Sequence, residues 1–121
     1  MSKAIQQGRA AVEKLLDEIP DAVNEVSTGG ATPLHMCGMS QKGQTVTSLI
    51  IARGGNIEAK DTYGFTPLHR MASNNLPIGA SALLEAGADP NASMGGITPL
   101  MIAKESHAWD VVRVLQEIKG A

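Results

Sequence analysis

A short motif that begins Thr-Pro-Leu recurs three times along this chain of 121 residues. The copies are Thr32-Pro33-Leu34-His35, Thr66-Pro67-Leu68-His69 and Thr98-Pro99-Leu100-Met101. Their first residues are 34 and 32 residues apart. A nearly constant period of this length indicates a stack of similar units in which each unit contacts only its neighbours. We therefore expect one short array of repeats.

Each copy of the motif carries the signals of a helix start. A threonine hydroxyl can cap the first turn, and proline fits the first helical position because no backbone hydrogen bond is lost there. A polar break follows, and then a second segment with apolar residues at helical spacing, as at Val111, Leu115 and Ile118. Gly54 and Gly87 stand where such a helix would end in a left-handed turn. Each unit is predicted to be a helix-turn-helix closed by a loop.

The amino-acid composition predicts a thinly layered core and excludes several classes of partner. Hydrophobic residues make up 43% of the chain, but only three residues are aromatic, so small aliphatic side chains must form the core. The formal net charge is −2, and the scattered basic residues form no cluster that would bind nucleic acid or an anionic membrane. No apolar run approaches the roughly 20 residues of a membrane span.

The cellular compartment is predicted from the N-terminus and from the cysteine content. The N-terminal residues lack the apolar region of a secretory signal. Cys37 is the single cysteine, so an internal disulfide is excluded and a reducing compartment is favoured. We expect a cytoplasmic protein, with a nuclear location left open.

The repeat resembles the ankyrin repeat family, and the resemblance covers nearly the whole chain. The copy at 61–93 follows the family pattern best, with Gly64, Ala72 and the run Gly87-Ala88-Asp89 at matching positions. The resemblance implies an all-α solenoid of helix-turn-helix units joined by β-turn or hairpin-like loops. We expect a single ankyrin-repeat domain over 1–121 with four repeats, at about 1–26, 27–60, 61–92 and 93–121, of which the first and last are caps.

Two departures from the family pattern lead to further expectations. In the last copy, Met101 replaces the usual histidine and Lys104 replaces a small residue, as expected of a repeat with nothing stacked beyond it. Gly79 stands in the second helix of the third repeat, where the family usually has a branched aliphatic residue. Because glycine costs about 0.5–1 kcal/mol relative to alanine inside a helix, we expect this helix to be the least stable.

The residue types present do not support a metal or catalytic site. Stacked helices lie roughly 8–10 Å apart, so His35 and His69 in neighbouring repeats cannot share a zinc ion, whose ligands lie at about 2.0–2.3 Å. The resemblance implies instead that each imidazole bonds turn backbone and ties its repeat to the next. Cys37 is expected to be a buried, inert small residue. No nucleophile, base and acid converge, so we expect no enzyme activity, no cofactor and no metal.

Recognition of another protein is the function class that remains. In the ankyrin family, the turn tips and the exposed side of the first helices line a concave face that takes the partner. Tyr63 and Phe65 lie on one such turn, and Tyr, Trp and Arg are the residues most enriched at binding hot spots. We predict a patch centred on these two residues. The predicted contact residues are Tyr63, Phe65, Arg70, Met94, Ile97, Met36, Met39, Thr62, Ser73 and Asn74.

The sequence is also compatible with several alternatives. Phe65 and Ile97 could instead pack between neighbouring turns, which would leave only Tyr63 presented. Trp109 could cover the end of the core or form a second contact on the outer side. At the level of function, we expect an adaptor, scaffold or inhibitor that is a monomer when free, and the alternative is a permanent structural subunit of a larger protein assembly.

Overall fold

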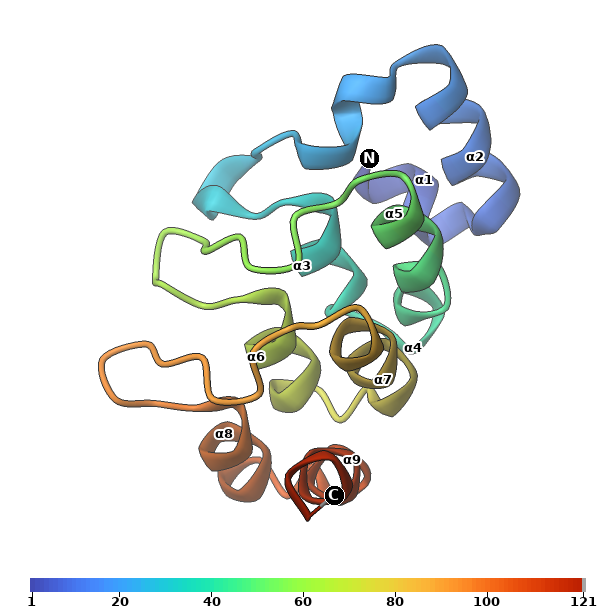
Figure 1. The fold of residues 1–121 in the computed structure, drawn as a ribbon. Coiled ribbons are helices and arrows are strands. Elements are labelled where there is room, and N and C mark those ends of the chain that lie inside the picture. Colours follow the sequence, from blue (N-terminus) through green and yellow to red (C-terminus); the bar gives the residue numbers. More distant parts are fainter. Residues whose placement is uncertain (121) are drawn as a thin grey trace.

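The computed structural model describes residues 1–120, with side chains described as far as Ile118. It is an all-α solenoid in which helices stack in two rows, and the loops project away from the inner row (Figure 1). The inner row consists of α1 (Ser2–Gln7), α3 (Pro33–Cys37), α6 (Pro67–Ser73) and α8 (Pro99–Glu105). The outer row consists of α2 (Arg9–Glu18), α5 (Thr47–Ala52), α7 (Pro77–Glu85) and α9 (Trp109–Gly120). The shorter elements are η1 (Pro20–Asn24), η2 (Thr28–Gly30) and α4 (Gln41–Gln44). The predicted fold class is confirmed.

The Thr-Pro motifs begin the inner helices α3, α6 and α8, as predicted. The hydroxyl of Thr66 accepts a hydrogen bond from the amide of His69 at 3.4 Å, and that of Thr98 accepts one from Met101 at 3.3 Å. A proline follows each threonine at the first helical position. The start of each of these helices is thus determined by local chemistry.

The outer helices α7 and α9 are capped by side chains from the preceding helix pair. Oε1 of Gln44 accepts a hydrogen bond from the amide of Gly79 at 3.0 Å, and Oδ1 of Asn75 accepts one from the amide of Val111 at 3.3 Å. Both amides are in the first turn of their helix, where no intrahelical acceptor exists. Stacking of neighbouring repeats therefore completes the hydrogen bonding of these two helices.

The position of Gly79 differs from the one expected from the sequence. It lies in the first turn of α7 rather than in the middle of the helix. A Cβ atom at this position would lie 2.5 Å from the end of the Met71 side chain. The missing side chain therefore lets α6 and α7 pack closely. Low stability of α7 remains a prediction, but the glycine also has a packing role that the sequence pattern did not indicate.

The core runs through the whole stack and contains mainly aliphatic side chains. Leu34, Leu68, Leu83 and Leu115 are each at most 1% exposed. Cys37 is fully buried, as predicted, and burial raises the pKa of its thiol to about 12. The thiol is therefore protonated and unreactive at neutral pH.

The polar break that follows the first Thr-Pro motif forms a helical turn in the structure. The polar run at 41–43 lies in α4, because the hydroxyl of Ser40 accepts a hydrogen bond from the amide of Gly43 at 2.9 Å and caps a single turn.

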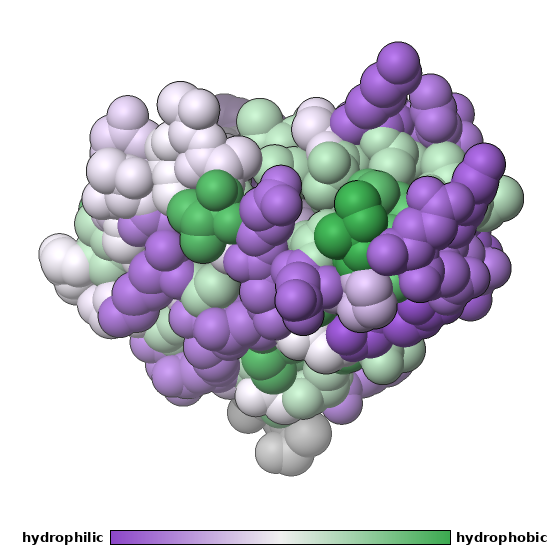
Figure 2. Space-filling view, turned by 90° about the horizontal axis from the view of Figure 1, so that it is seen from above, coloured by the Kyte–Doolittle hydropathy of each residue, from purple (hydrophilic) through white to green (hydrophobic). Residues whose placement is uncertain are grey.

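Figure 2 looks onto the end of the stack that begins with α1 and α2, where hydrophilic side chains dominate and apolar atoms form separate spots. None of the helices in residues 1–120 has the length and apolar character of a membrane span.

Candidate protein-binding surface

Two buried histidines connect the inner helices to the loops that follow. The backbone amide of Thr32 donates to Nδ1 of His35 at 3.1 Å, and Nε2 of the same ring lies 2.7 Å from the carbonyl oxygen of Phe65. His69 repeats this arrangement, with Nε2 at 2.9 Å from the carbonyl oxygen of Ile97. Because the amide must donate and the carbonyl must accept, each ring is neutral with its proton on Nε2. The tie between repeats implied for these histidines is present.

Asp61 organises the loop that carries the two aromatic residues. Its Oδ1 accepts hydrogen bonds from the amides of Tyr63 at 2.9 Å and Phe65 at 3.0 Å, and its Oδ2 accepts from Nε of Arg70 at 3.2 Å and from a terminal nitrogen of Arg70. Only 3% of the Asp61 side chain is exposed. Burial alone would raise the pKa of Asp61, but the hydrogen bonds from Arg70, Phe65 and Tyr63 outweigh it and lower the pKa. One buried carboxylate thus joins the loop to α6.

Arg70 and Phe65 pack on each other beside this carboxylate. The guanidinium carbon of Arg70 lies 4.5 Å from the centroid of the Phe65 ring, a cation–π geometry. Phe65 also contacts the ring of His69, with the two ring centroids 5.6 Å apart and an interplanar angle of 61°. Phe65 is therefore half-buried, and these two contacts are with α6 of its own repeat rather than with a neighbouring turn.

A first hollow of about 340 Å³ lies between α3 and the Asp61 loop. Its surface is mostly apolar, and two of its side chains, Met39 and Tyr63, are 64% and 67% exposed. The lining residues are Ser2, Ser27, Thr28, Gly29, Ala31, His35, Met36, Met39, Asp61, Tyr63 and Arg70.

A second hollow of about 240 Å³ lies between α6 and α8. The lining residues are Phe65, His69, Arg70, Ser73, Ile102, Glu105 and Ser106. Arg70 lines both hollows and forms the wall that they share. We refer to the two hollows together as the inner face.

Six of the ten predicted contact residues line the inner face, and four do not. Those on it are Met36, Met39, Tyr63, Phe65, Arg70 and Ser73. Thr62 lines a hollow on another side of the loops, and Met94 packs against Gly64. Ile97 is 37% exposed but lies outside both hollows. The side-chain amide of Asn74 donates to the carbonyl oxygen of Gly38 at 2.7 Å, which ties two repeats together.

The predicted contact set omits four residues of the second hollow, namely His69, Ile102, Glu105 and Ser106. The repeat register alone places the last three of these on the same side of the inner helices as the predicted contact residues. Counting from the threonine of each motif, Ile102 occupies the position of Met36 and Arg70. A rule applied equally to all repeats would have selected all three positions.

Other parts of the described chain offer weaker candidates for a site. A hollow of about 520 Å³ lies between η1 and the Asp61 loop, and six of its nine lining residues are polar. Within residues 1–120, no three His, Cys, Asp or Glu side chains gather closely enough to hold a metal ion. Trp109 is 58% exposed and stacks on His107 with ring centroids 5.6 Å apart, so most of its surface faces outward.

Comparisons with known proteins agree with this architecture. A family model described as ankyrin repeats in three copies matches residues 1–94 and also residues 38–121. RelA-associated inhibitor of Mus musculus is 34% identical over 87 residues, which covers 65% of this chain and 10% of that protein. Protein fem-1 homolog A of Danio rerio is 35% identical over 78 residues, or 54% of this chain and 13% of that protein. An ankyrin repeat protein of Rickettsia bellii is 33% identical over 60 residues, or 50% of this chain and 25% of that protein. The chain thus spans between a tenth and a quarter of the length of these relatives.

Proposed function

The chain belongs to the ankyrin repeat family, whose members are generally non-enzymatic modules that bind other proteins, and we propose that it binds a partner protein through its inner face. The observation that carries this proposal is the pair of hollows on either side of Arg70. Exposed methionine and tyrosine side chains lie there beside Arg70, which is fixed by its ion pair with Asp61. This combination is suited to a binding hot spot.

The inner face is held in shape before any partner arrives. Its loop is fixed by the carboxylate of Asp61 and by the imidazole of His35, both of which are buried. A preformed surface loses little conformational entropy on binding, so more of the contact energy contributes to affinity. Recognition would therefore not require folding of the loop.

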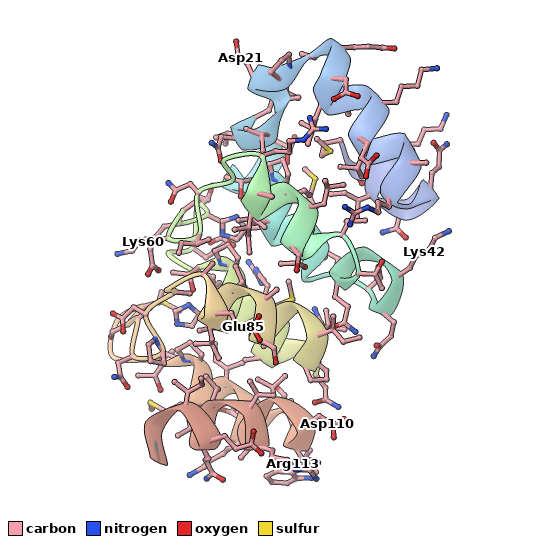
Figure 3. The ribbon with its side chains drawn as sticks, turned by 45° about the vertical axis from the view of Figure 1, so that its right-hand side comes forward. Asp21, Lys42, Lys60, Glu85, Asp110 and Arg113 are labelled. Atoms are coloured by element: carbon pink, nitrogen blue, oxygen red, sulfur yellow. The ribbon has the colours of Figure 1, made fainter. Side chains whose placement is uncertain are left out.

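The outer face is chemically different and fits a solvated surface. Figure 3 shows Glu85 and Arg113 on the outer helices α7 and α9, with further charged side chains spread over other elements. These residues are exposed and carry both signs of charge. Charged residues are depleted at the core of protein interfaces, which favours the inner face as the binding side.

The proposed mode of action is steric. A protein whose own binding or active surface lies on the inner face would be inhibited because that surface is covered. One relative is named RelA-associated inhibitor, which describes an inhibitory role for that protein. For this chain we propose an adaptor, scaffold or inhibitor that is a non-catalytic monomer when free, in the cytoplasm or nucleus.

A permanent subunit of a larger assembly is the second candidate, and the apolar lining of the first hollow is the feature that favours it. Size-exclusion chromatography of the isolated chain separates the two roles. A soluble monomer supports the regulator. A chain that is insoluble or aggregated without its partner supports the obligate subunit.

Affinity purification with quantitative mass spectrometry tests the binding face. Tyr63→Ala combined with Met39→Ala removes two exposed side chains of the first hollow, and Ile78→Ala, at a side chain 59% exposed on α7, is the matched control. We expect the double variant to lose at least tenfold of the partner recovered by the wild type, while the control retains it. Equal loss in both variants, or in neither, contradicts the proposal.

A further inference from the structure

We propose that the partner segment bound by the inner face carries a bulky apolar side chain followed or preceded closely by a lysine or arginine. The apolar side chain enters the first hollow, and the cation pairs with Glu105 in the second. This inference rests on the proposed function and specifies the chemistry of the partner.

The charges that line the inner face leave one negative charge without a partner. Asp61 and Arg70 form a hydrogen-bonded ion pair, so their charges cancel. His35 and His69 are buried and neutral. Glu105 is exposed, and no ion pair involving it occurs among the described residues. The charged side chains lining the two hollows therefore sum to −1.

The second hollow combines the two features that bind a long cationic side chain, namely an apolar surface and a carboxylate. Beside the carboxylate of Glu105 it presents the apolar surfaces of Phe65 and Ile102. Lysine and arginine bury their methylene stems on apolar surface while the charged end remains hydrated or paired. A cation whose stem lies on these two side chains can reach the carboxylate, whereas an acidic residue there would be repelled.

The first hollow fits an uncharged, bulky side chain. Met36, Met39 and Tyr63 are the large apolar side chains of its lining, and thioethers adapt to irregular shapes. Its charged atoms belong to Asp61 and Arg70, whose charges already cancel. A partner charge placed there would lose hydration without gaining an ion pair.

Arg70 does not make the inner face a site for acidic segments or phosphate. Its side chain is 29% exposed, and the guanidinium is already bonded to Asp61 through two nitrogens and stacked on Phe65. Binding a second anion would require it to weaken these contacts. The partner chemistry is therefore apolar and basic rather than acidic.

A random peptide library displayed on phage, selected against the whole chain, tests the inference. We expect enriched peptides to pair Leu, Ile, Met, Phe or Trp with a nearby Lys or Arg. The affinity of selected synthetic peptides is then measured by fluorescence anisotropy for the wild type and three variants, Glu105→Gln, Glu105→Lys and, as the control on the outer helix, Glu85→Gln. We expect Glu105→Gln to weaken binding about threefold to fivefold, Glu105→Lys to weaken it more, and Glu85→Gln to change nothing. Both glutamates are exposed, so all three variants are expected to fold.

The possible failures are distinguishable. Peptides that lose binding to the Tyr63→Ala and Met39→Ala double variant, but lack basic residues or are indifferent to Glu105→Gln, overturn the inference and leave the proposed function standing. Peptides that bind the double variant as well as the wild type contradict both. A selection without enriched peptides also overturns the inference, because the inference names a linear segment, while the affinity purification still decides the proposed function.

Discussion

The guanidinium of Arg70 stacks on the ring of Phe65, with its central carbon 4.5 Å from the ring centroid, and it donates at the same time to the buried carboxylate of Asp61. The wall between the two hollows is therefore held by the carboxylate that also accepts hydrogen bonds from the loop amides. The shape of the inner face and the stability of the fold thus depend on the same ion pair.

Replacement of Arg70 by methionine should strongly destabilise the protein. Arg70→Met keeps much of the apolar stem but leaves Asp61 as a buried charge without its cation. Breaking a buried pair from one side costs about 3 kcal/mol in free energy of unfolding. Urea unfolding at neutral pH measures this change, with Arg113→Met on the exposed face of α9 as the control. A loss for Arg70→Met no larger than for the control would contradict the structural role of the pair.

The contribution of Asp61 should depend on pH with a definite sign. Because the pKa of this carboxyl is lowered in the folded protein, its stabilising effect is complete above the unfolded value of about 3.9 and is lost as pH falls through the lower folded value. We expect the difference in unfolding free energy between the wild type and Asp61→Asn to be largest at neutral pH and to shrink below about pH 3.9. Urea titrations of both proteins at several pH values measure it. A difference that grows on acidification would refute the account.

Because of the two buried histidines, we expect a second loss of stability at a higher pH than the one due to Asp61. Burial lowers the pKa of His35 and His69 against the opposing effect of their bonds to loop carbonyls. The folded state thus binds fewer protons than the unfolded chain, so stability is full above about pH 6.5 and falls as pH drops below it. Thermal unfolding between neutral pH and about pH 5.5 should show the slope. In the double variant His35→Gln with His69→Gln the slope should be shallower, although the protein is less stable; an unchanged slope would exclude these histidines as the cause.

Two glycines in close contacts should respond differently to alanine. A Cβ at Gly38 would lie 2.7 Å from Cβ of Arg70, which cannot move without the backbone, whereas at Gly79 it meets the flexible end of Met71. We expect Gly38→Ala to lower the free energy of unfolding by about 1–3 kcal/mol. Gly79→Ala should change it by less than about 1 kcal/mol, because helix propensity offsets part of the repacking. Denaturant unfolding of the two variants side by side checks the order, and the reverse order would contradict the packing described for both sites.

The local features of the fold could be predicted because their causes lie close together in the sequence. The caps of Thr66 and Thr98 follow from a Thr-Pro pair, and the period aligns the repeats so that His35 reaches the following loop. The caps supplied by Gln44 and Asn75 could not be predicted, since they depend on how closely two repeats approach.

The candidate site could likewise be predicted only in part from the sequence. The repeat register was enough to bring Met36, Met39 and Tyr63 to one side of the molecule. It did not reveal that Asn74 bonds the carbonyl of Gly38, or that Met94 covers Gly64, because those contacts depend on the path of the loops. Residues on the helices were therefore assigned to the inner face more reliably than residues at the loop tips.

The loss of stability on replacing Trp109 shows whether its ring lies on the surface or covers the core. It is 58% exposed and stacks on His107, whereas Leu115 in the same helix is fully buried. We expect Trp109→Ala to cost less than about 1 kcal/mol and Leu115→Ala about 2–5 kcal/mol. Thermal unfolding of the two variants measures this contrast. A cost for Trp109→Ala as large as that for Leu115→Ala would mean that the ring covers the core.

Site-specific photo-cross-linking can capture a partner protein while it is bound to the inner face. A photoreactive phenylalanine analogue is placed at Tyr63 on the inner face or at Ile78 on the outer helix α7, two positions with 67% and 59% exposure. After irradiation in cell extract, adducts are separated by gel and identified by mass spectrometry. We expect a discrete adduct from position 63 that is absent from position 78. Adducts from position 78 alone would contradict binding at the inner face.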